Sequence, residues 1–345
     1  MATYLFAVVI SFFANFILIV PFIDLLYNLK LRRPAQQGKD ILNKPTPVFN
    51  RFHLKKTGTP VGGGILLLIT TVLIYLLFIF TYFFIYKKIP SNYPSVIEEI
   101  KIILFTFVFF SFLGIFDDLN KIFFWKKNQQ FGLRIRQKLI FETILALIVG
   151  YWLHSSLKIK IIYIPFFGVF DIGVFYILFA AFVIVAFSNA VNITDGLDGL
   201  ASGVLMIALS AFWVISRSIL DVSTSLFIAA WLGGLVAFLY FNIYPARIFL
   251  GDAGALSFGA TFAVIGLILG KSFSLIVIGG IFVIEIASSF IQIFGKKILK
   301  RKILPVAPLH LWLQLKGWEE PKIVMRFWII SVLFAVFGLM IAFMK

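Results

Sequence analysis

The chain has 345 residues, of which 61% are hydrophobic and only 13% are charged, and 43 of them are phenylalanine. This composition excludes an ordinary soluble globular domain and is typical of a polytopic helical membrane protein. Cysteine is absent, so disulfides are excluded and the redox compartment cannot be inferred from the thiols.

Apolar segments near the length of about 20 residues that a helix needs to cross a bilayer recur along the whole chain. The first lacks a basic start and a small-residue cleavage site, so we expect a retained helix and not a signal peptide. The predicted spans are 4–27, 61–86, 101–116, 138–154, 172–191, 199–215, 223–241, 254–270, 273–294 and 324–344. The predicted fold is therefore all-α, with about ten transmembrane helices in one domain over 1–345.

One connection has a different pattern. Side chains of different polarity alternate along residues 158–173, and Pro165 and Gly168 stand at the middle of this stretch. The pattern predicts a short external β-hairpin.

The basic residues indicate the orientation of these spans. The odd-numbered connections hold 22 Lys and Arg residues and the even-numbered ones only seven. By the positive-inside rule the odd connections are cytosolic and both termini face outward. The net charge of +16 is then mostly a cytosolic belt that sets topology and contacts anionic lipid, and no nucleic-acid partner is expected.

Three oxygen-bearing side chains recur at steps of three between the fifth and sixth spans. Asn192, Asp195 and Asp198 lie in the stretch SNAVNITDGLDGLA, and on a helix this spacing keeps side chains near one face. A helix-cap network is the plain structural alternative. Converging carboxylate and amide oxygens otherwise suit Mg²⁺, which usually arrives with phosphates. The stretch predicts a cation and phosphate site at a membrane face.

The second cytosolic connection begins with adjacent acids. Asp117 and Asp118 point about 100° apart on a helix, so they cannot serve one ligand in the same way. We expect one to face a cation and the other to accept a proton. Lys121 shares their face and could hold a phosphate or form a helix-end salt bridge.

A third acid lies in the fourth cytosolic connection. Asp252 stands between Gly251 and Gly254, and glycines permit close approach of backbone to a ligand. Such a string alone is also an ordinary turn. All five cytosolic connections carry polar residues of catalytic type, however, whereas the outer ones carry few. An active site is therefore predicted from the connections 28–60, 117–137, 192–198, 242–253 and 295–322.

These acids suit phosphoryl transfer, which depends on positioning, Mg²⁺ and cations more than on covalent participation of the protein. At a bilayer surface they could join a soluble phosphate donor to a lipid phosphate acceptor. The chain also resembles the polyprenyl-phosphate N-acetylhexosamine-1-phosphate transferases, and within them the phospho-N-acetylmuramoyl-pentapeptide transferase branch. The strings that carry the resemblance are HLKKTGTPVGGG, GIFDDLNK, SNAVNITDGLDGLA, FNIYPARIFLGDAG, EIASSFIQ and APLHLWLQLKGWEEPKIVMRFWII.

The resemblance implies transfer of phospho-MurNAc-pentapeptide from its UDP carrier to undecaprenyl phosphate, giving lipid I and UMP, the first membrane step of peptidoglycan synthesis. It implies a multi-pass protein of the bacterial inner membrane, a cytosolic active site and a homodimer. By position, Asp252 would bind Mg²⁺ on the donor pyrophosphate, with Asp195 as a further metal ligand. Asp117 would deprotonate the acceptor or act covalently, and Asp118 would complete the catalytic set.

The resemblance assigns substrate binding to a further set of residues. The substrate phosphates would contact Lys56 and Lys121, and the nucleotide would lie along the acidic stretch 192–198. The uracil would stack near the ring of Phe249. The set is Lys56, Lys121, Asn192, Asp195, Asp198, Phe249, Gly251 and His310.

The chain departs from this family pattern near its carboxyl end. In that branch this region has a pattern like Pro-x-His-His-His-Phe-Glu. Here only the first histidine, His310, is present, and it is followed by Leu, Trp, Leu and Gln314. Gln314, Lys300 or Lys302 could compensate, or the donor could differ. GlcNAc-1-phosphate transfer from UDP-GlcNAc thus stays open as the sister activity.

A secondary transporter is the alternative from another class. It would place acids near the midplane, where only Glu285 lies, and for Glu285 we expect a structural pairing. Glu319 and Glu320 are expected to be solvated loop charges.

Overall fold

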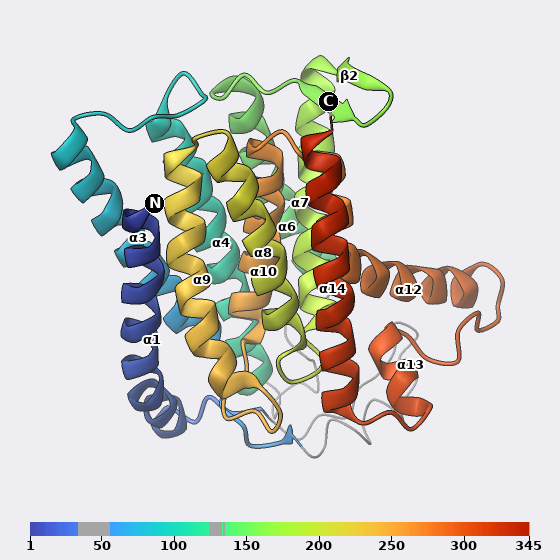
Figure 1. Ribbon diagram of the computed structural model, residues 1–345. Helices are drawn as coiled ribbons and strands as arrows, with labels where there is room; N and C mark the ends of the chain where they lie inside the picture. Colours follow the sequence, from blue (N-terminus) through green and yellow to red (C-terminus); the bar gives the residue numbers. More distant parts are fainter. Residues whose placement is uncertain (34–55, 124–132, 134, 345) are drawn as a thin grey trace.

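The computed structural model describes residues 1–33, 56–123, 133 and 135–344, and these form one bundle of helices (Figure 1). Nine helices in these residues are long and apolar enough to cross a membrane. They are α1 (Ala2–Asn28), α3 (Gly63–Tyr86), α4 (Val96–Phe123), α6 (Ile135–Ser155), α7 (Tyr176–Thr194), α8 (Leu200–Ser218), α9 (Val222–Asn242), α10 (Gly251–Ile268) and α14 (Glu320–Phe343). The predicted multi-pass all-α fold is confirmed.

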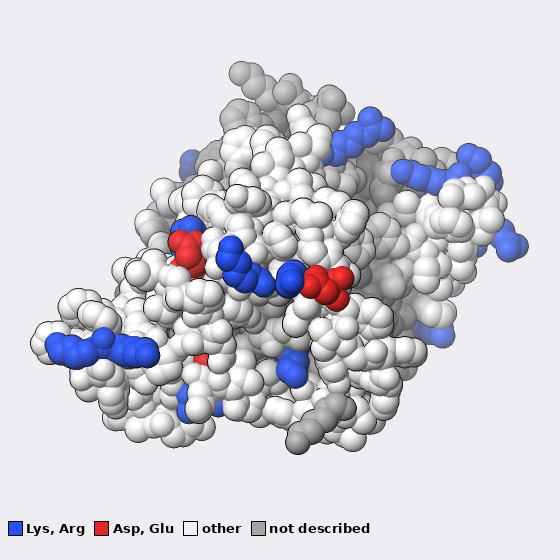
Figure 2. Space-filling model, turned by 90° about the horizontal axis from the view of Figure 1, so that it is seen from above, with Lys and Arg blue, Asp and Glu red and all other residues white. Residues whose placement is uncertain are grey.

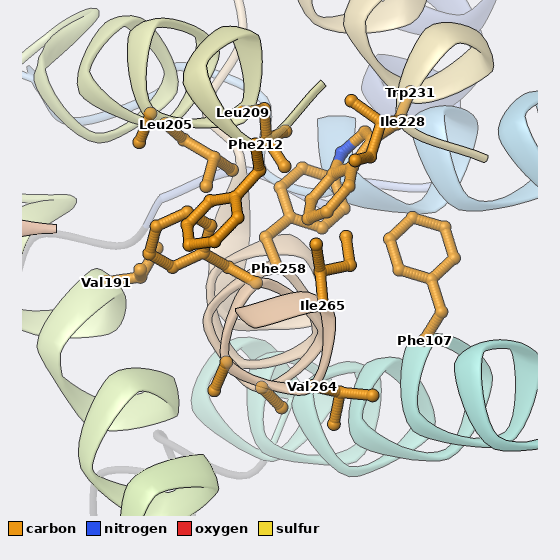
Figure 3. Packing of buried hydrophobic residues seen from close by; sticks show 14 of the residues in the cluster. Phe107, Val191, Leu205, Leu209, Phe212, Ile228, Trp231, Phe258, Val264 and Ile265 are labelled. Atoms are coloured by element: carbon orange, nitrogen blue, oxygen red, sulfur yellow. The ribbon is translucent and has the colours of Figure 1, made fainter. Parts of the chain in front are cut away.

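Helix α10 is the centre of the bundle and is buried almost throughout its length. Small residues let neighbouring backbones approach it closely, for example Gly259 against α7. At the neighbouring position of α10, Phe258 stacks on Phe107 of α4 with ring centroids 5.5 Å apart. Trp231 of α9 meets the ring of Phe258 edge-on, with centroids 5.0 Å apart. Figure 3 shows these rings around α10. This packing fixes the first turn of α10, which carries Asp252.

The predicted ninth span, 273–294, is not a continuous helix. It consists of α11 (Ser272–Ile278) and α12 (Gly280–Lys297), which meet at an angle of 80°. The break falls at Gly279 and Gly280, where two residues without a Cβ adjoin and the ring of Phe334 packs against the second. Helix α12 consequently projects sideways from the bundle (Figure 1). It leads to the short α13 (Leu309–Leu315).

The predicted β-hairpin is confirmed. Strands β1 (Ile161–Ile164) and β2 (Gly168–Asp171) pair antiparallel, and the 3₁₀ turn η2 (Gly173–Phe175) leads into α7. The hairpin, the start of α1 and the end of α14 lie at one end of the bundle (Figure 1). Seen from this end, the described surface is mostly uncharged, with only separate groups of charged side chains (Figure 2).

The opposite end holds the polar connections. Helix α4 runs beyond its predicted boundary of 116 to Phe123, so Asp117, Asp118 and Lys121 are helical. Beside it, three short backbone segments pair in irregular fashion: Arg32 bridges to Pro60, and Val61 bridges to Phe249. These contacts bring both ends of the connection between α1 and α3, and the connection between α9 and α10, to the start of α10.

Candidate active site

A cavity of about 170 Å³ opens at this end of the bundle, where α4 and α7 end and α10 begins. Charged groups of both signs surround it. Its lining residues are Arg33, Lys56, Val61, Asp118, Lys121, Ile122, Asp195, Gly196, Leu197, Asp198, Asn242, Phe249, Gly251 and Asp252. Of the residues predicted as a site, Asn192, His310 and Asp117 are not part of this lining.

Two carboxylates and two ammonium groups converge beside the cavity. Asp252 Oδ2 lies 2.8 Å from Lys121 Nζ and 2.6 Å from Lys138 Nζ. Asp117 Oδ2 lies 3.1 Å and 3.3 Å from the same two nitrogens. Asp117 Oδ1 is held separately by the backbone N–H of Leu133 at 2.7 Å. These four side chains from α4, α6 and α10 form the charged quartet.

Asp118 has a different environment from Asp117, as adjacent helical positions predict. Its Oδ2 accepts a hydrogen bond of 3.1 Å from the backbone N–H of Ala253, in the first turn of α10. A Cβ at Gly251 would lie 2.7 Å from that oxygen, and the φ of Gly251 is +78°, so glycine is required there. Asp118 therefore caps α10 and holds Asp252 in position.

A second ion cluster joins three connections on the other wall. Lys56 Nζ lies 2.6 Å from Asp198 Oδ1 and 2.5 Å from Glu320 Oε1. Glu320 also accepts from the backbone N–H of Asp198, and Asp198 Oδ2 accepts from that of Ala246. The prediction that Glu320 is a solvated loop charge is wrong, because its side chain is only 10% exposed and its Oε1 accepts from two donors. Asp198 is likewise fixed in the wall.

Asp195 lies at the end of α7 and lines the cavity. Burial raises the pKa of its carboxyl to about 8, against the opposing attraction of Arg33. Around neutral pH the group is therefore mostly protonated and can donate a hydrogen bond to an anionic ligand. Asn192 lies one turn earlier, outside the lining.

The aromatic side of the cavity is formed by Phe249. The guanidinium of Arg33 lies over its ring, with Cζ 5.3 Å from the centroid. The backbone N–H of Phe249 donates to Pro60, while its carbonyl accepts from Gly62 and Gly63. The ring is thus held at the cavity by backbone bonds to the segment that enters α3.

His310 lies behind the cavity wall and is only 2% exposed. Its Nδ1 lies 3.0 Å from Glu285 Oε2, which confirms the expected pairing of Glu285. Gln314 is buried on the same helix, whereas Lys300 and Lys302 are exposed on the segment before it. None of these four groups lines the cavity.

The donor set fits a magnesium ion that arrives together with a phosphorylated substrate. No group of three or more His, Asp or Glu side chains placed to hold a metal occurs in the parts of the chain that the structure describes. The Oδ2 atoms of Asp117 and Asp252 nevertheless both lie within 3.3 Å of Lys138 Nζ. Mg²⁺ is commonly held by one or two carboxylates plus substrate phosphates, which this arrangement can supply.

Three residues of the site were missed from the sequence. The sequence indicates Lys138 only as part of the basic belt, whereas in the structure it lies in the first turn of α6 and contacts the acids. Glu320 gave no signal, because its partners Lys56 and Asp198 are distant in sequence. The role of Arg33 depends on backbone pairing with Thr59 that no periodicity indicates.

Comparison with known proteins finds similar sequences over most of the chain. The model of Glycosyl transferase family 4 matches residues 100–270. The chain is 37% identical over 284 residues to the phospho-N-acetylmuramoyl-pentapeptide-transferase of Caldanaerobacter subterraneus subsp. tengcongensis, covering 82% of this chain and 84% of the relative. It is also 37% identical over 329 residues to the Clostridium perfringens (strain 13 / Type A) protein of the same name, covering 95% of each. The Oceanobacillus iheyensis relative is 35% identical over 291 residues, covering 84% of this chain and 85% of the relative.

Proposed function

The chain belongs to the phospho-N-acetylmuramoyl-pentapeptide-transferase family of membrane phosphoglycosyl transferases, and we propose that it transfers phospho-MurNAc-pentapeptide from UDP-MurNAc-pentapeptide to undecaprenyl phosphate. The products are lipid I and UMP. The observation that carries the proposal is the charged quartet, in which two acids and two lysines from three membrane helices converge. Such a group suits a phosphate reaction at a bilayer surface.

The proposed reaction exchanges one phosphoanhydride for another. An oxygen of the lipid phosphate attacks the β-phosphorus of the donor, the bond from that phosphorus to the bridging oxygen breaks, and UMP leaves with the bonding electrons. Lys121 and Lys138 offset the negative charge that gathers on the transferring phosphoryl group. Asp117, held by the Leu133 N–H, is the base for the acceptor phosphate and orients it through the same lysines.

Magnesium is the proposed cofactor. Asp252 would hold it, with Asp117 close enough to contribute a second oxygen and the donor pyrophosphate supplying further ligands. The ion supplies charge stabilisation for the phosphates. Asp195, whose pKa is raised by burial, would hydrogen-bond the donor.

The nucleotide is proposed to lie against the side of the cavity that Phe249 and Lys56 line. Phe249 offers a ring for stacking of uracil, next to the backbone of Gly251. Lys56 is held by Asp198 and Glu320 at the same cavity, where it is available to the donor phosphates. In this arrangement the donor lies between the quartet and Phe249.

The cavity end is proposed to face the cytosol of a bacterium, with the protein in its inner membrane. The support is the excess of Lys and Arg in the connections at this end. The resemblance also favours a homodimer. Single cysteines introduced at the exposed positions 166 and 302 of this cysteine-free chain can report the orientation. In intact cells, a membrane-impermeant maleimide should label the cysteine at position 166 and not the one at position 302.

The donor is tested by running two nucleotide sugars side by side. Purified protein with Mg²⁺ and undecaprenyl phosphate should release UMP from UDP-MurNAc-pentapeptide and not from UDP-GlcNAc. Turnover of UDP-GlcNAc alone would overturn the proposed donor and support the sister activity, which the missing family histidines keep open.

A further inference from the structure

A buried acid–imidazole pair lies outside the cavity, where α12 meets α13. Glu285 is fully buried and its carboxylate contacts His310 twice. Oε1 accepts from the backbone N–H of His310 at 3.1 Å, and Oε2 lies 3.0 Å from the ring Nδ1. A carboxylate enclosed in this way is costly unless both oxygens are satisfied, so the two contacts belong together.

The two contacts favour one tautomer of His310. The backbone N–H can only donate and an ionised carboxylate can only accept, so Nδ1 must carry a proton toward Oε2. The ring is therefore protonated at Nδ1, and its other nitrogen is directed away from Glu285. Fixing a histidine through a carboxylate on one nitrogen is a common way to orient the other.

The other nitrogen meets the turn that carries the acidic stretch. A Cβ at Gly196 would lie 2.5 Å from His310 Nε2, so the imidazole edge touches the backbone of Gly196 directly. Gly196 lines the cavity between Asp195 and Leu197, and its carbonyl is 3.4 Å from Lys56 Nζ. The pair thus supports, from behind, the wall on which the proposed donor would bind.

We propose that Glu285 is a positioning residue for donor binding: it fixes the tautomer and place of His310, and His310 in turn holds the Gly196 turn that shapes the donor side of the cavity. This inference rests on the proposed function for its effect on the donor. Its structural part, the tautomer set by Glu285, does not. The single family histidine that the chain keeps is the one that Glu285 holds.

A neighbouring contact provides a matched control. Ser288 Oγ accepts from the backbone N–H of Leu309 at 3.1 Å and donates to the carbonyl of Glu285. Ser288→Ala therefore loosens the same junction of α12 and α13 without touching the carboxylate or the imidazole. A merely structural role for Glu285 predicts the same phenotype in both variants.

The decisive variant is Glu285→Gln, which keeps the shape of the side chain. Its one carbonyl oxygen must face the backbone N–H of His310, because an NH₂ group there would oppose another donor. The NH₂ group then faces Nδ1, which must lose its proton and become an acceptor, so the ring proton moves to Nε2. The substitution thus inverts the tautomer while conserving the packing.

The tautomer is measured by ¹⁵N NMR of histidine-labelled protein in detergent micelles. The chain has only three histidines, so the spectrum of His310→Asn identifies the signal. We expect Nδ1 protonated in the wild type and in Ser288→Ala, and unprotonated in Glu285→Gln. A wild-type signal with Nδ1 unprotonated, or an unchanged tautomer in Glu285→Gln, would overturn the proposal without any assay of activity.

Kinetics test the consequence for the donor. We expect Glu285→Gln to lower kcat/KM for the nucleotide donor by about 10- to 100-fold, because a displacement of about 1 Å that arises away from the reacting atoms can cost about 100-fold in rate. The KM for the lipid acceptor should stay within about twofold, since the acceptor lies by the quartet. An inverted tautomer with unchanged donor kinetics would refute the positioning role. Absence of turnover in the wild type would instead refute the proposed function.

Discussion

Lys138 donates to Asp252 from the first turn of α6, with Nζ 2.6 Å from Oδ2, although the two residues belong to different connections. Its ammonium also reaches Asp117 at 3.3 Å, so one lysine bridges the two acids proposed for the reaction. Lys121 makes the same two contacts from α4. The negative charges of the two acids are therefore balanced by two fixed lysine side chains.

Lys138→Met should abolish most of the activity. The substitution keeps the aliphatic chain but removes a cation directed at the transferring phosphoryl group, which typically costs about 100-fold or more in kcat. Steady-state release of UMP measures the effect. Lys302→Met is the matched control, because Lys302 belongs to the same basic belt but is exposed away from the cavity. Equal rates in the two variants would remove Lys138 from the mechanism.

Asp252→Asn should lower turnover and weaken the response of the rate to Mg²⁺. The amide keeps the volume but loses the charge that a hard cation requires, so the Mg²⁺ concentration for half-maximal rate should rise at least about tenfold. Asp117→Asn should lower kcat with a smaller change in that concentration. Asp171→Asn, on the exposed hairpin, is the control. Full activity of the wild type in excess chelator would contradict the proposed cofactor.

Much of this site could be predicted from the sequence because its acids lie in short, specific strings. Asp118, Asp195, Asp198 and Asp252 all line one cavity, as their common membrane face predicts. The role of each acid could not be predicted, since it depends on contacts between segments that are distant in sequence. Asp118 caps α10, and Asp198 is fixed by Lys56 and Ala246.

The fold was predictable for a similar reason, and its main error has a local cause. Hydropathy detects apolar length, so it found nine helices in the described parts of the chain, although α4 extends beyond its predicted bounds at both ends. It does not detect bending. The segment from Ser272 to Lys297 is apolar enough to pass as one span, and only the glycine pair at its break indicates otherwise.

Glu320→Gln should destabilise the protein through Lys56. The pair is nearly buried, so removing one charge leaves Lys56 with Asp198 alone. We expect a lower Tm in detergent, and a double-variant cycle with Lys56→Met should give a coupling of about 0.5–3 kcal/mol. Glu319→Gln, at the exposed neighbouring position, should leave Tm unchanged. Additive effects in the cycle would show that the ion pair contributes nothing to stability.

The end of the bundle opposite the cavity should show a pH-dependent stability. Burial first, and then the nearby carboxylate of Glu99, raise the pKa of Asp221 to about 8. Because this value exceeds that of the unfolded chain, the stabilisation is complete below about pH 4 and is lost as the pH rises through about 8. The Tm should therefore fall over this range.

Asp221→Asn is the informative variant for this effect. Asparagine caps a helix as well as aspartate does, so the hydrogen bond that Asp221 accepts from the backbone N–H of Thr224 can be kept. The decline of Tm with pH should become shallower in this variant. A decline identical to that of the wild type would show that Asp221 is not responsible.

The most direct measurement follows the β-phosphorus of the donor. UDP-MurNAc-pentapeptide labelled at that atom is incubated with the protein, Mg²⁺ and undecaprenyl phosphate, and the nucleotide and lipid products are quantified. We expect the label to enter the lipid in an amount equal to the UMP released, and Lys138→Met to lose both together. Release of UDP, or label remaining with the nucleotide, would mean that the bond broken is not the phosphoanhydride and would contradict the proposed reaction.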